Sequence, residues 1–418
     1  MKQSSCGLDF GTSNSTLGVM HANKPSLVQL EGDYPNLPSA IFFNYDDEQT
    51  YFGREALEEY IGGVDGRLMR SLKSVLGTSL MNETTQLKRR RVGFADIIAE
   101  FVFHLKKTAE AKTGTTLSQV VVGRPAHFVD DDDAADDEAQ NQLEAIIKSA
   151  GFAEVQFQFE PIAAAFDYEM TAGSHKELAF IVDIGGGTAD FSVIRTGGDR
   201  ANSDRSDDIL ATYGVHVGGT DIDRILAVEK IMPLLGYHSK LKGKGLPAPS
   251  WLFNDLATWH RINALYSHAL RTQVKQMMLE AEQPLLLKRL ANVLENKKGH
   301  YLLNCAETMK VDLTDAERAH QEFDIGAEDF SIDVDRTEFA AMLESWLAAI
   351  SGAVTKTLAL AAVPITDIAT VFLTGGTTLS PPVRELLQQR FNTSQIVIGD
   401  SLGSVGLGLT LAASRRFR

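Results

Sequence analysis

Two glycine-rich segments, each with an aspartate in front, carry the residues best suited to chemistry. Residues 7–15 read GLDFGTSNS and residues 181–194 read IVDIGGGTADFSVI. In each segment an apolar run ends at an aspartate, a tight glycine turn follows, and a second apolar run returns. Such a turn presents free backbone N–H groups, which form a nest for anions and above all for phosphates. The residues predicted to cradle phosphates are Gly11, Thr12, Ser13, Asn14, Gly185, Gly186, Gly187 and Thr188.

The carboxylates beside these turns suit a metal ion that accompanies a phosphate. Mg²⁺ prefers carboxylates, retains several waters and bridges phosphate oxygens. Asp9, Asp183 and Asp190 are therefore candidate magnesium-binding residues. Aspartates also cap turns without binding anything, and for Asp183 that alternative stays open. The two turns together predict a bound Mg-nucleotide.

Other common catalytic signatures are missing from the sequence. Gly243-Lys244 is followed by Gly245, so no Gly-x4-Gly-Lys-Ser/Thr loop is formed, and there is neither a His-Glu-x-x-His motif nor a Gly-x-Ser-x-Gly elbow. The ten histidines form no ligand set.

The two segments align with each other, which indicates an internal duplication. Asp9 aligns with Asp183, and Gly11 with Gly185. Each segment reads as a β-hairpin whose turn uses glycine for unusual φ/ψ values and for close backbone approach. A duplication predicts two similar α/β lobes whose hairpins point into a shared cleft; the alternative is two unrelated hairpins.

Periodicity predicts the elements around the hairpins. We expect helices over 95–112, over 339–360 and from Pro381, short strands over 119–123 and 371–373, and a mostly helical insertion over 252–294 with a break at Pro284. Residues 130–138 hold seven acids, which suit a first helical turn; a calcium site is the alternative. The basic run at 88–91 favours a solvated loop over a partner contact.

Composition limits the class of protein. A chain of 418 residues exceeds the ~250–300 that one core supports, so two or three lobes are expected. A net charge of −15 argues against nucleic acid or an anionic membrane as the main partner. Two cysteines allow no disulfide framework. The N-terminus lacks a secretory signal and no apolar run is long enough for a membrane span. These features favour a soluble, cytoplasmic protein.

The motifs together resemble the actin-like ATPase superfamily, and within it the nucleotide-binding domain of the seventy-kilodalton heat-shock chaperones, the DnaK type. The segments that carry the resemblance, in chain order, are GLDFGTSNS at 7–15, SLKSVLG at 71–77, EPIAAAFDY at 160–168, IVDIGGGTADFSVI at 181–194, HVGGTDID at 216–223, Glu307-x-x-Lys310-x-x-x-Thr314 and FLTGGTTLSPPV at 372–383. They extend over essentially the whole chain.

The resemblance implies an α/β actin-like ATPase fold: duplicated, ribonuclease H-like lobes that flank a nucleotide cleft and carry inserted outer subdomains. It places lobe I at 1–172, with an outer subdomain at 38–94. Lobe II would span 173–370, with a mainly helical outer subdomain at about 225–305. Residues 371–418 would return to the cleft and to lobe I.

Residue roles follow from the same resemblance. Lys73, Glu160, Thr188, Asp190 and Asp9 would be catalytic, with magnesium held through waters by Asp9 and Asp190 and with Lys73 at the γ-phosphate. The residues implied to hold the rest of ATP or ADP are Gly218, Gly219, Glu307, Lys310, Thr314, Gly375, Gly376, Leu379 and Asp400.

Two departures from the family pattern stand out. The family usually places an arginine over the adenine face, where this sequence has Leu379, so about 0.5–2 kcal/mol of cation–π attraction would be lost. Family chaperones also continue into a peptide-binding β-sandwich and a helical lid, whereas this sequence ends at Arg418. The pattern is most similar to the short, YegD-like branch of the family.

The function predicted from this resemblance is a slow heat-shock-type ATPase that acts as a nucleotide-dependent, chaperone-like switch without its own peptide-binding domain. It implies ATP and an unidentified protein client or partner, with a J-domain or nucleotide-exchange co-chaperone as candidates. The alternatives are a sugar or polyol kinase of the same superfamily, a nucleotide-dependent filament protein, and a binder that has lost catalysis.

Overall fold

The computed structural model describes residues 4–129, 132–172, 176–197, 205–242, 246–326, 330–400 and 403–417. These residues form two compact units. The first unit comprises Met1–His216, Ile350–Leu379 and Glu385–Arg418, and the second comprises Val217–Ala349 and Ser380–Arg384. The predicted lobe boundaries, which fall at other residues, remain predictions.

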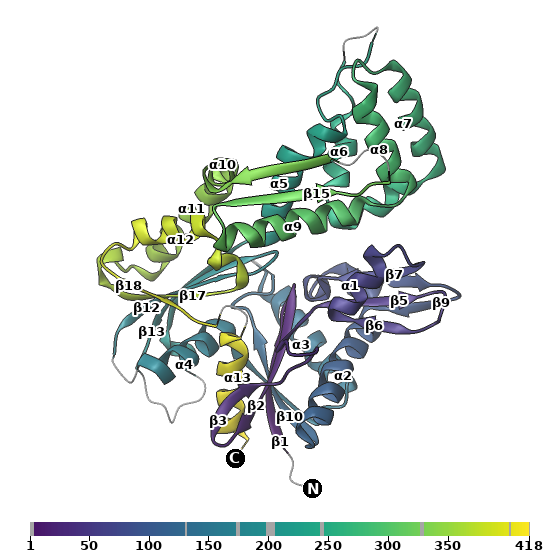
Figure 1. Ribbon diagram of the computed structural model, residues 1–418. Coiled ribbons are helices and arrows are strands. Elements are labelled where there is room, and N and C mark those ends of the chain that lie inside the picture. The colour runs from purple at the N-terminus through teal and green to yellow at the C-terminus, as the bar shows by residue number, and fades with distance from the viewer. Residues whose placement is uncertain are drawn as a thin grey trace. The chain divides into compact units, whose positions relative to one another are not determined.

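The first unit is built on two mixed sheets (Figure 1). The strands of one sheet, in spatial order, are β11 (Glu154–Phe159), β10 (Leu117–Arg124), β1 (Ser4–Phe10), β2 (Asn14–His21) and β3 (Lys24–Leu27), with β4 (Asn36–Pro38) also paired to β2. The strands of the other are β18 (Gln395–Ile398), β17 (Ile368–Thr374), β12 (Leu178–Ile184), β13 (Ala189–Arg195) and β14 (Ile209–Val215).

The two sheets repeat one topology. In the first sheet β1 pairs antiparallel with β2 and parallel with β10. In the second, β12 pairs antiparallel with β13 and parallel with β17. The outer strands follow the same rule, because β3 and β14 are antiparallel to their neighbours whereas β11 and β18 are parallel. An internal duplication would produce this match.

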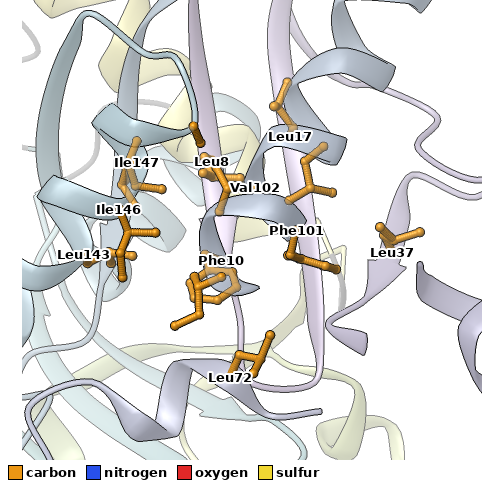
Figure 2. Close-up of a cluster of buried hydrophobic side chains, with 14 of the residues drawn as sticks. Leu8, Phe10, Leu17, Leu37, Leu72, Phe101, Val102, Leu143, Ile146 and Ile147 are labelled. Atoms are coloured by element: carbon orange, nitrogen blue, oxygen red, sulfur yellow. The ribbon is translucent and has the colours of Figure 1, made fainter. Parts of the chain in front are cut away.

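A hydrophobic core fixes the first sheet against two helices. The predicted helix at 95–112 is α2 (Phe94–Thr113), and α3 (Asp133–Ser149) packs beside it. Figure 2 shows apolar side chains of β1, β2, α2 and α3 meeting in this core; those labelled include Leu8, Phe10, Leu17, Phe101, Val102, Leu143, Ile146 and Ile147. Burying side chains of this size is the main favourable term in folding.

Two helices of the first unit approach each other very closely. They are α4 (Glu160–Ala172) and α13 (Ser404–Arg416). A β-carbon placed on Gly408 would lie 1.8 Å from the carbonyl oxygen of Ala163. Only glycine fits at this position, because a side chain would overlap the backbone of α4. The absence of a side chain lets the backbone of α13 pack directly against that of α4.

Residues 38–94 add smaller elements to the first unit. These are β5 (Ala40–Asn44), β6 (Thr50–Phe52), α1 (Gly53–Ile61), β7 (Gly66–Arg70), the 3₁₀ helices η1 (Leu72–Val75) and η2 (Ser79–Asn82), β8 (Thr84–Leu87) and β9 (Arg90–Gly93). The basic run at 88–91 forms the turn of the β8–β9 hairpin and the start of β9, and all four side chains are exposed. This agrees with the predicted solvated segment.

The second unit is mainly helical. Its elements are α5 (Gly219–Leu226), the π-helical η4 (Ala227–Ile231), η5 (Met232–Leu235), α6 (Ser250–Leu256), η6 (Trp259–Tyr266), α7 (His268–Glu280), α8 (Pro284–Glu295), α9 (Gly299–Asp315), β15 (Arg318–Phe323), β16 (Phe330–Asp335) and α10 (Arg336–Met342). The predicted break at Pro284 is confirmed, because α8 begins there.

Two more 3₁₀ helices belong to the first unit. Helix η3 (Ser206–Asp208) precedes β14, and η7 (Ile365–Asp367) precedes β17.

The prediction of one helix over 339–360 is wrong. The chain forms α10 and then α11 (Glu344–Ala361), with a turn at Leu343. The Leu343 amide donates to the carbonyls of both Phe339 and Ala340, so the helical ladder tightens at that residue. The predicted helix from Pro381 is α12 (Pro381–Arg390).

The acidic run has structural roles where it is described. The Asp132 side chain accepts the Ala135 N–H and caps α3. Asp136 forms a 2.5 Å ion pair with Arg124. Asp130 and Asp131 lie outside the described residues. Among the described helices, none is long and apolar enough to cross a membrane.

Replacing Phe101 with alanine tests the core. Phe101 is fully buried, whereas Phe103 on the same helix is 47% exposed. We expect Phe101→Ala to lower the free energy of unfolding by about 3–5 kcal/mol, and Phe103→Ala to change it by less than about 1 kcal/mol. Urea unfolding of the two variants measures both values, and equal losses would contradict this packing.

Candidate functional site

The two glycine turns lie next to each other. The first joins β1 to β2 at Gly11–Ser13, and the second joins β12 to β13 at Gly185–Thr188. In the second turn the Gly185 N–H donates to the Thr188 carbonyl at 3.0 Å. A β-carbon placed on Gly187 would lie 3.8 Å from Cγ2 of Thr12. The predicted phosphate-cradling residues of both turns therefore come together.

Close approach explains the glycine of the first turn, and none of Gly11, Gly185 and Gly187 has an unusual φ. The φ angles of Gly11, Gly185 and Gly187 lie outside the left-handed region, so that part of the prediction is wrong. A β-carbon on Gly11 would lie 2.2 Å from the Asn14 carbonyl oxygen, so a side chain cannot fit there. At Gly185 and Gly187 an added β-carbon would meet nothing closer than 3.8 Å, which leaves open space over the second turn.

The segment around β4 braces the first turn. The Ser39 hydroxyl donates to the Gly11 carbonyl at 2.7 Å, and the Ser39 N–H donates to the Ser13 carbonyl at 2.8 Å. The Asn36 amide donates to Oδ1 of Asn14 at 3.0 Å. These bonds occupy carbonyl groups of the turn and fix its shape.

Lys73 is held by its neighbours in the core. It lies in η1 between Leu72 and Leu76, which are almost fully buried. Just beyond, the Gly77 N–H donates to the Gln142 side chain of α3 at 3.0 Å. This short segment is therefore attached both to the core and to α3.

Lys73 forms an ion pair with Glu160. Its Nζ lies 2.6 Å from Oε1 of Glu160, and the side chains are only 11% and 15% exposed. Glu160 is the first residue of α4, where the helix dipole stabilises a negative charge. A partly desolvated pair with this geometry is stronger than a surface pair.

Three aspartates share the surroundings of this pair. Asp183 stands directly opposite Asp190 across the β12–β13 hairpin. Burial, followed by the charges of Glu160, Asp190 and Asp9, raises the pKa of Asp183 well above its usual value. Burial and the nearby Glu160 likewise raise the pKa of Asp9, to about 7.

The lysine responds in the opposite sense. Burial alone disfavours its charge, but Glu160 and Asp9 outweigh burial and raise the pKa of Lys73. Lys73 therefore stays protonated within an excess of carboxylates.

The carboxylate cluster fits a hydrated Mg²⁺. Hard oxygen donors that repel one another in a partly desolvated space are stabilised by a divalent cation. Among the described residues, no group of three His, Cys, Asp or Glu side chains is close enough to hold a metal directly. Asp9, Asp183 and Asp190 suit an ion that keeps most of its own waters.

A small pocket lies against the carboxylates. Glu160, Asp183 and Asp190 line it, together with the side chains of Pro125, Ala126, Pro161, Ala164, Ile181, Ser192, Thr212 and Thr374. No motif in the sequence singled out its three hydroxyl residues. Ser192 lies two residues after Asp190, on the same face of β13. Thr212 lies in β14 and Thr374 in β17, so their places in the pocket depend on the strand register.

The segment after β17 touches the second turn. Gly375 has φ +81°, and a β-carbon there would lie 2.4 Å from the Ile184 carbonyl oxygen, so glycine is required. The Thr377 hydroxyl donates to the Gly185 carbonyl at 2.9 Å. Gly376 and Leu379 begin and end the 3₁₀ helix η8 (Gly376–Leu379). Asp400 is exposed, and its carbonyl accepts the Ser404 N–H at the start of α13.

The remaining predicted residues form a separate set in the second unit. Glu307, Lys310 and Thr314 follow one another along α9 at spacings that share a helix face. Nζ of Lys310 lies 2.7 Å from Oδ1 of Asp223 and 3.3 Å from the Gly219 carbonyl. The Gly218 N–H donates to Asp221 at the start of α5. Lys310 thus connects the predicted helix to the predicted Gly218-Gly219 loop.

Comparison with known proteins identifies the family. The family described as Hsp70 protein matches residues 84–233 and 288–401, which is more than half of the chain. The chain therefore belongs to the Hsp70 family.

Curated chaperones are among the similar sequences. The chaperone protein DnaK of Buchnera aphidicola is 28% identical over 240 residues, covering 52% of this chain and 36% of that protein. The chaperone protein HscA homolog of Rickettsia bellii is 26% identical over 230 residues, covering 53% and 36%. The chaperone protein DnaK of Ureaplasma urealyticum is 30% identical over 221 residues, covering 53% and 34%. The chain thus spans about a third of the length of these relatives.

Neutralising Asp9 tests the electrostatics of the site. The pKa of Asp9 is raised from 3.8 to about 7, so folding loses stability as pH rises between these values, and the penalty is complete above the upper one. At about 1.4 kcal/mol per pKa unit, we expect Asp9→Asn to stabilise the nucleotide-free protein by a few kcal/mol at pH 8 and by less at pH 5. Urea unfolding at both pH values measures this, and a gain that is the same at both would contradict it.

Proposed function

We propose that this chain is a heat-shock-type ATPase, which binds Mg-ATP and hydrolyses it to ADP and phosphate as a nucleotide-dependent, chaperone-like switch. The observation that carries the proposal is the protonated Lys73 among four carboxylates, beside two adjoining glycine turns. The finer architecture belongs to the same proposal: two duplicated, ribonuclease H-like lobes of the actin-like type that flank the nucleotide.

The turns and Lys73 would act on the phosphates. Backbone N–H groups at Gly11–Asn14 and Gly185–Thr188 would donate to phosphate oxygens, since a β-carbon on Gly185 or Gly187 would meet no described atom closer than 3.8 Å. Lys73 would place a compact positive charge at the γ-phosphate, where negative charge develops during transfer. Its bond to Glu160 would hold the ammonium in position before the nucleotide arrives.

The carboxylates would divide two tasks. Asp9, Asp183 and Asp190 would hold Mg²⁺ through waters, and Mg²⁺ when bound supplies charge that offsets the phosphate oxygens. Asp190 would also orient the attacking water by accepting its hydrogen bond, and Glu160 would contribute to the water shell. The Thr188 hydroxyl would donate to the γ-phosphate.

The nucleoside would be held by the other predicted residues. The resemblance assigns the ribose and adenine edge to Glu307, Lys310 and Thr314. The further residues proposed to contact the nucleotide are Gly218, Gly219, Gly375, Gly376, Leu379 and Asp400. A protein client or partner, a J-domain or nucleotide-exchange co-chaperone, a cytoplasmic location and membership of the YegD-like branch are parts of the proposal that follow from the family likeness.

Two substitutions separate hydrolysis from nucleotide binding. We expect Asp190→Asn and Thr188→Ala to slow single-turnover ATP hydrolysis with Mg²⁺ by roughly 10²-fold, while ADP affinity changes by less than about tenfold. The reason is that Thr188 would act on the γ-phosphate and Asp190 on the attacking water. ADP has no γ-phosphate, and no water attacks it. Isothermal titration with ADP supplies the binding values.

Three results would contradict the proposal. The first is equal losses of hydrolysis and ADP affinity in these variants. The second is transfer of the γ-phosphate to a sugar or polyol in place of water. The third is a native chain that binds neither ATP nor ADP at millimolar concentration with Mg²⁺.

A further inference from the structure

One glycine inside a strand lies directly against Asp190. Gly214 is in β14 and stands opposite Asp190 of β13 in the antiparallel register. A β-carbon placed on Gly214 would lie 2.8 Å from Oδ1 of Asp190. The next nearest atoms, the Ala189 carbonyl oxygen and Cγ of Asp190, are both 3.9 Å away. The side chain that Gly214 lacks would therefore meet one carboxylate oxygen and little else.

Glycine is otherwise a poor choice at this position. It weakens strands because it loses more chain entropy on folding and offers no side chain to pack. Its φ here lies outside the left-handed region, so the backbone conformation does not require it. Contact with Asp190 is the remaining reason for glycine.

The other neighbour of Asp190 across the strands is a second acidic residue. Asp183 stands opposite Asp190 on β12, so Asp183, Asp190 and Gly214 form one row across three strands. Like charges that face each other across a strand pair repel. The Asp190 carboxylate therefore rests on the Gly214 side, in the space that an alanine methyl group would take.

We propose that Gly214 is a positioning residue for the hydrolysis of ATP: the missing β-carbon leaves room for the Asp190 carboxylate on the side of the row away from Asp183. This inference rests on the proposed function, because it assumes that Asp190 serves the reaction. A methyl group at 214 would displace the end of a flexible side chain and leave the backbone in place. The fold should tolerate it, and the reaction should not.

The test combines Gly214→Ala with Asp190→Asn in a double-mutant cycle. We expect Gly214→Ala to slow single-turnover ATP hydrolysis by on the order of 10²-fold, the effect of a misplaced reacting group, with ADP affinity within about threefold of the native value. In the Asp190→Asn background the same glycine change should cost nothing more, because its effect passes through the carboxylate.

Gly352 supplies the matched control. It lies exposed in α11, and a β-carbon there would meet no atom within 4 Å. Gly352→Ala should leave hydrolysis unchanged, which removes a general effect of adding a methyl group. Thermal unfolding of Gly214→Ala should match the native chain.

The outcomes distinguish this inference from the function on which it rests. If the native chain hydrolyses ATP and Gly214→Ala does so equally well, only the role of Gly214 is overturned. The same holds if Gly214→Ala does not fold, or if its effect adds to that of Asp190→Asn in the double mutant. A native chain without hydrolysis overturns the proposed function. In that case crystal structures of the native chain and of Gly214→Ala still test whether Gly214 sets the position of Asp190, and an Asp190 side chain in the same rotamer in both would contradict it.

Discussion

Among the residues that the structure describes, four carboxylates share one partly desolvated space with Lys73, and this imbalance of charge dominates the candidate site. Asp9, Glu160, Asp183 and Asp190 repel one another, and burial followed by this repulsion raises the pKa values of Asp9 and Asp183. Lys73 offsets only one of the charges. A fold that kept such a site for stability alone would gain more from apolar side chains of similar size. The Mg²⁺ ion of the proposed function would offset part of this negative charge.

Rigid backbone elements hold this unfavourable cluster together. The two glycine turns connect strands of two sheets that have the same topology. Helices α4 and α13 pack against each other where Gly408 lies against the Ala163 carbonyl. The core leucines on either side of Lys73 fix the lysine from a third direction. Because the supports are strands, helix ends and a buried core, the repelling side chains cannot relax by moving apart. Membership of the Hsp70 family agrees with a site of this kind.

Much of this arrangement could be predicted from local sequence, and the failures have a common cause. The hairpins, the helix at 94–113 and the break at Pro284 follow from periodicity and turn residues within a few positions. The Lys73–Glu160 pair joins residues 87 apart, and only the family resemblance indicated either residue. Thr212 and Gly214 were missed because their importance depends on which residue of β13 they face. The prediction of one helix over 339–360 was wrong because the Leu343 N–H donates to two carbonyl groups, and this local change leaves no signal in the apolar pattern.

The most direct test of the account is single-turnover ATP hydrolysis with Mg²⁺, comparing the native chain with Lys73→Ala. We expect hydrolysis to depend on Lys73 and to fall by roughly 10²–10³-fold without it, because the positive charge of its ammonium group is then lost from the γ-phosphate. Hydrolysis at the same rate in both proteins would contradict the proposed role of Lys73 at the γ-phosphate, since the carboxylate cluster would then act without its lysine.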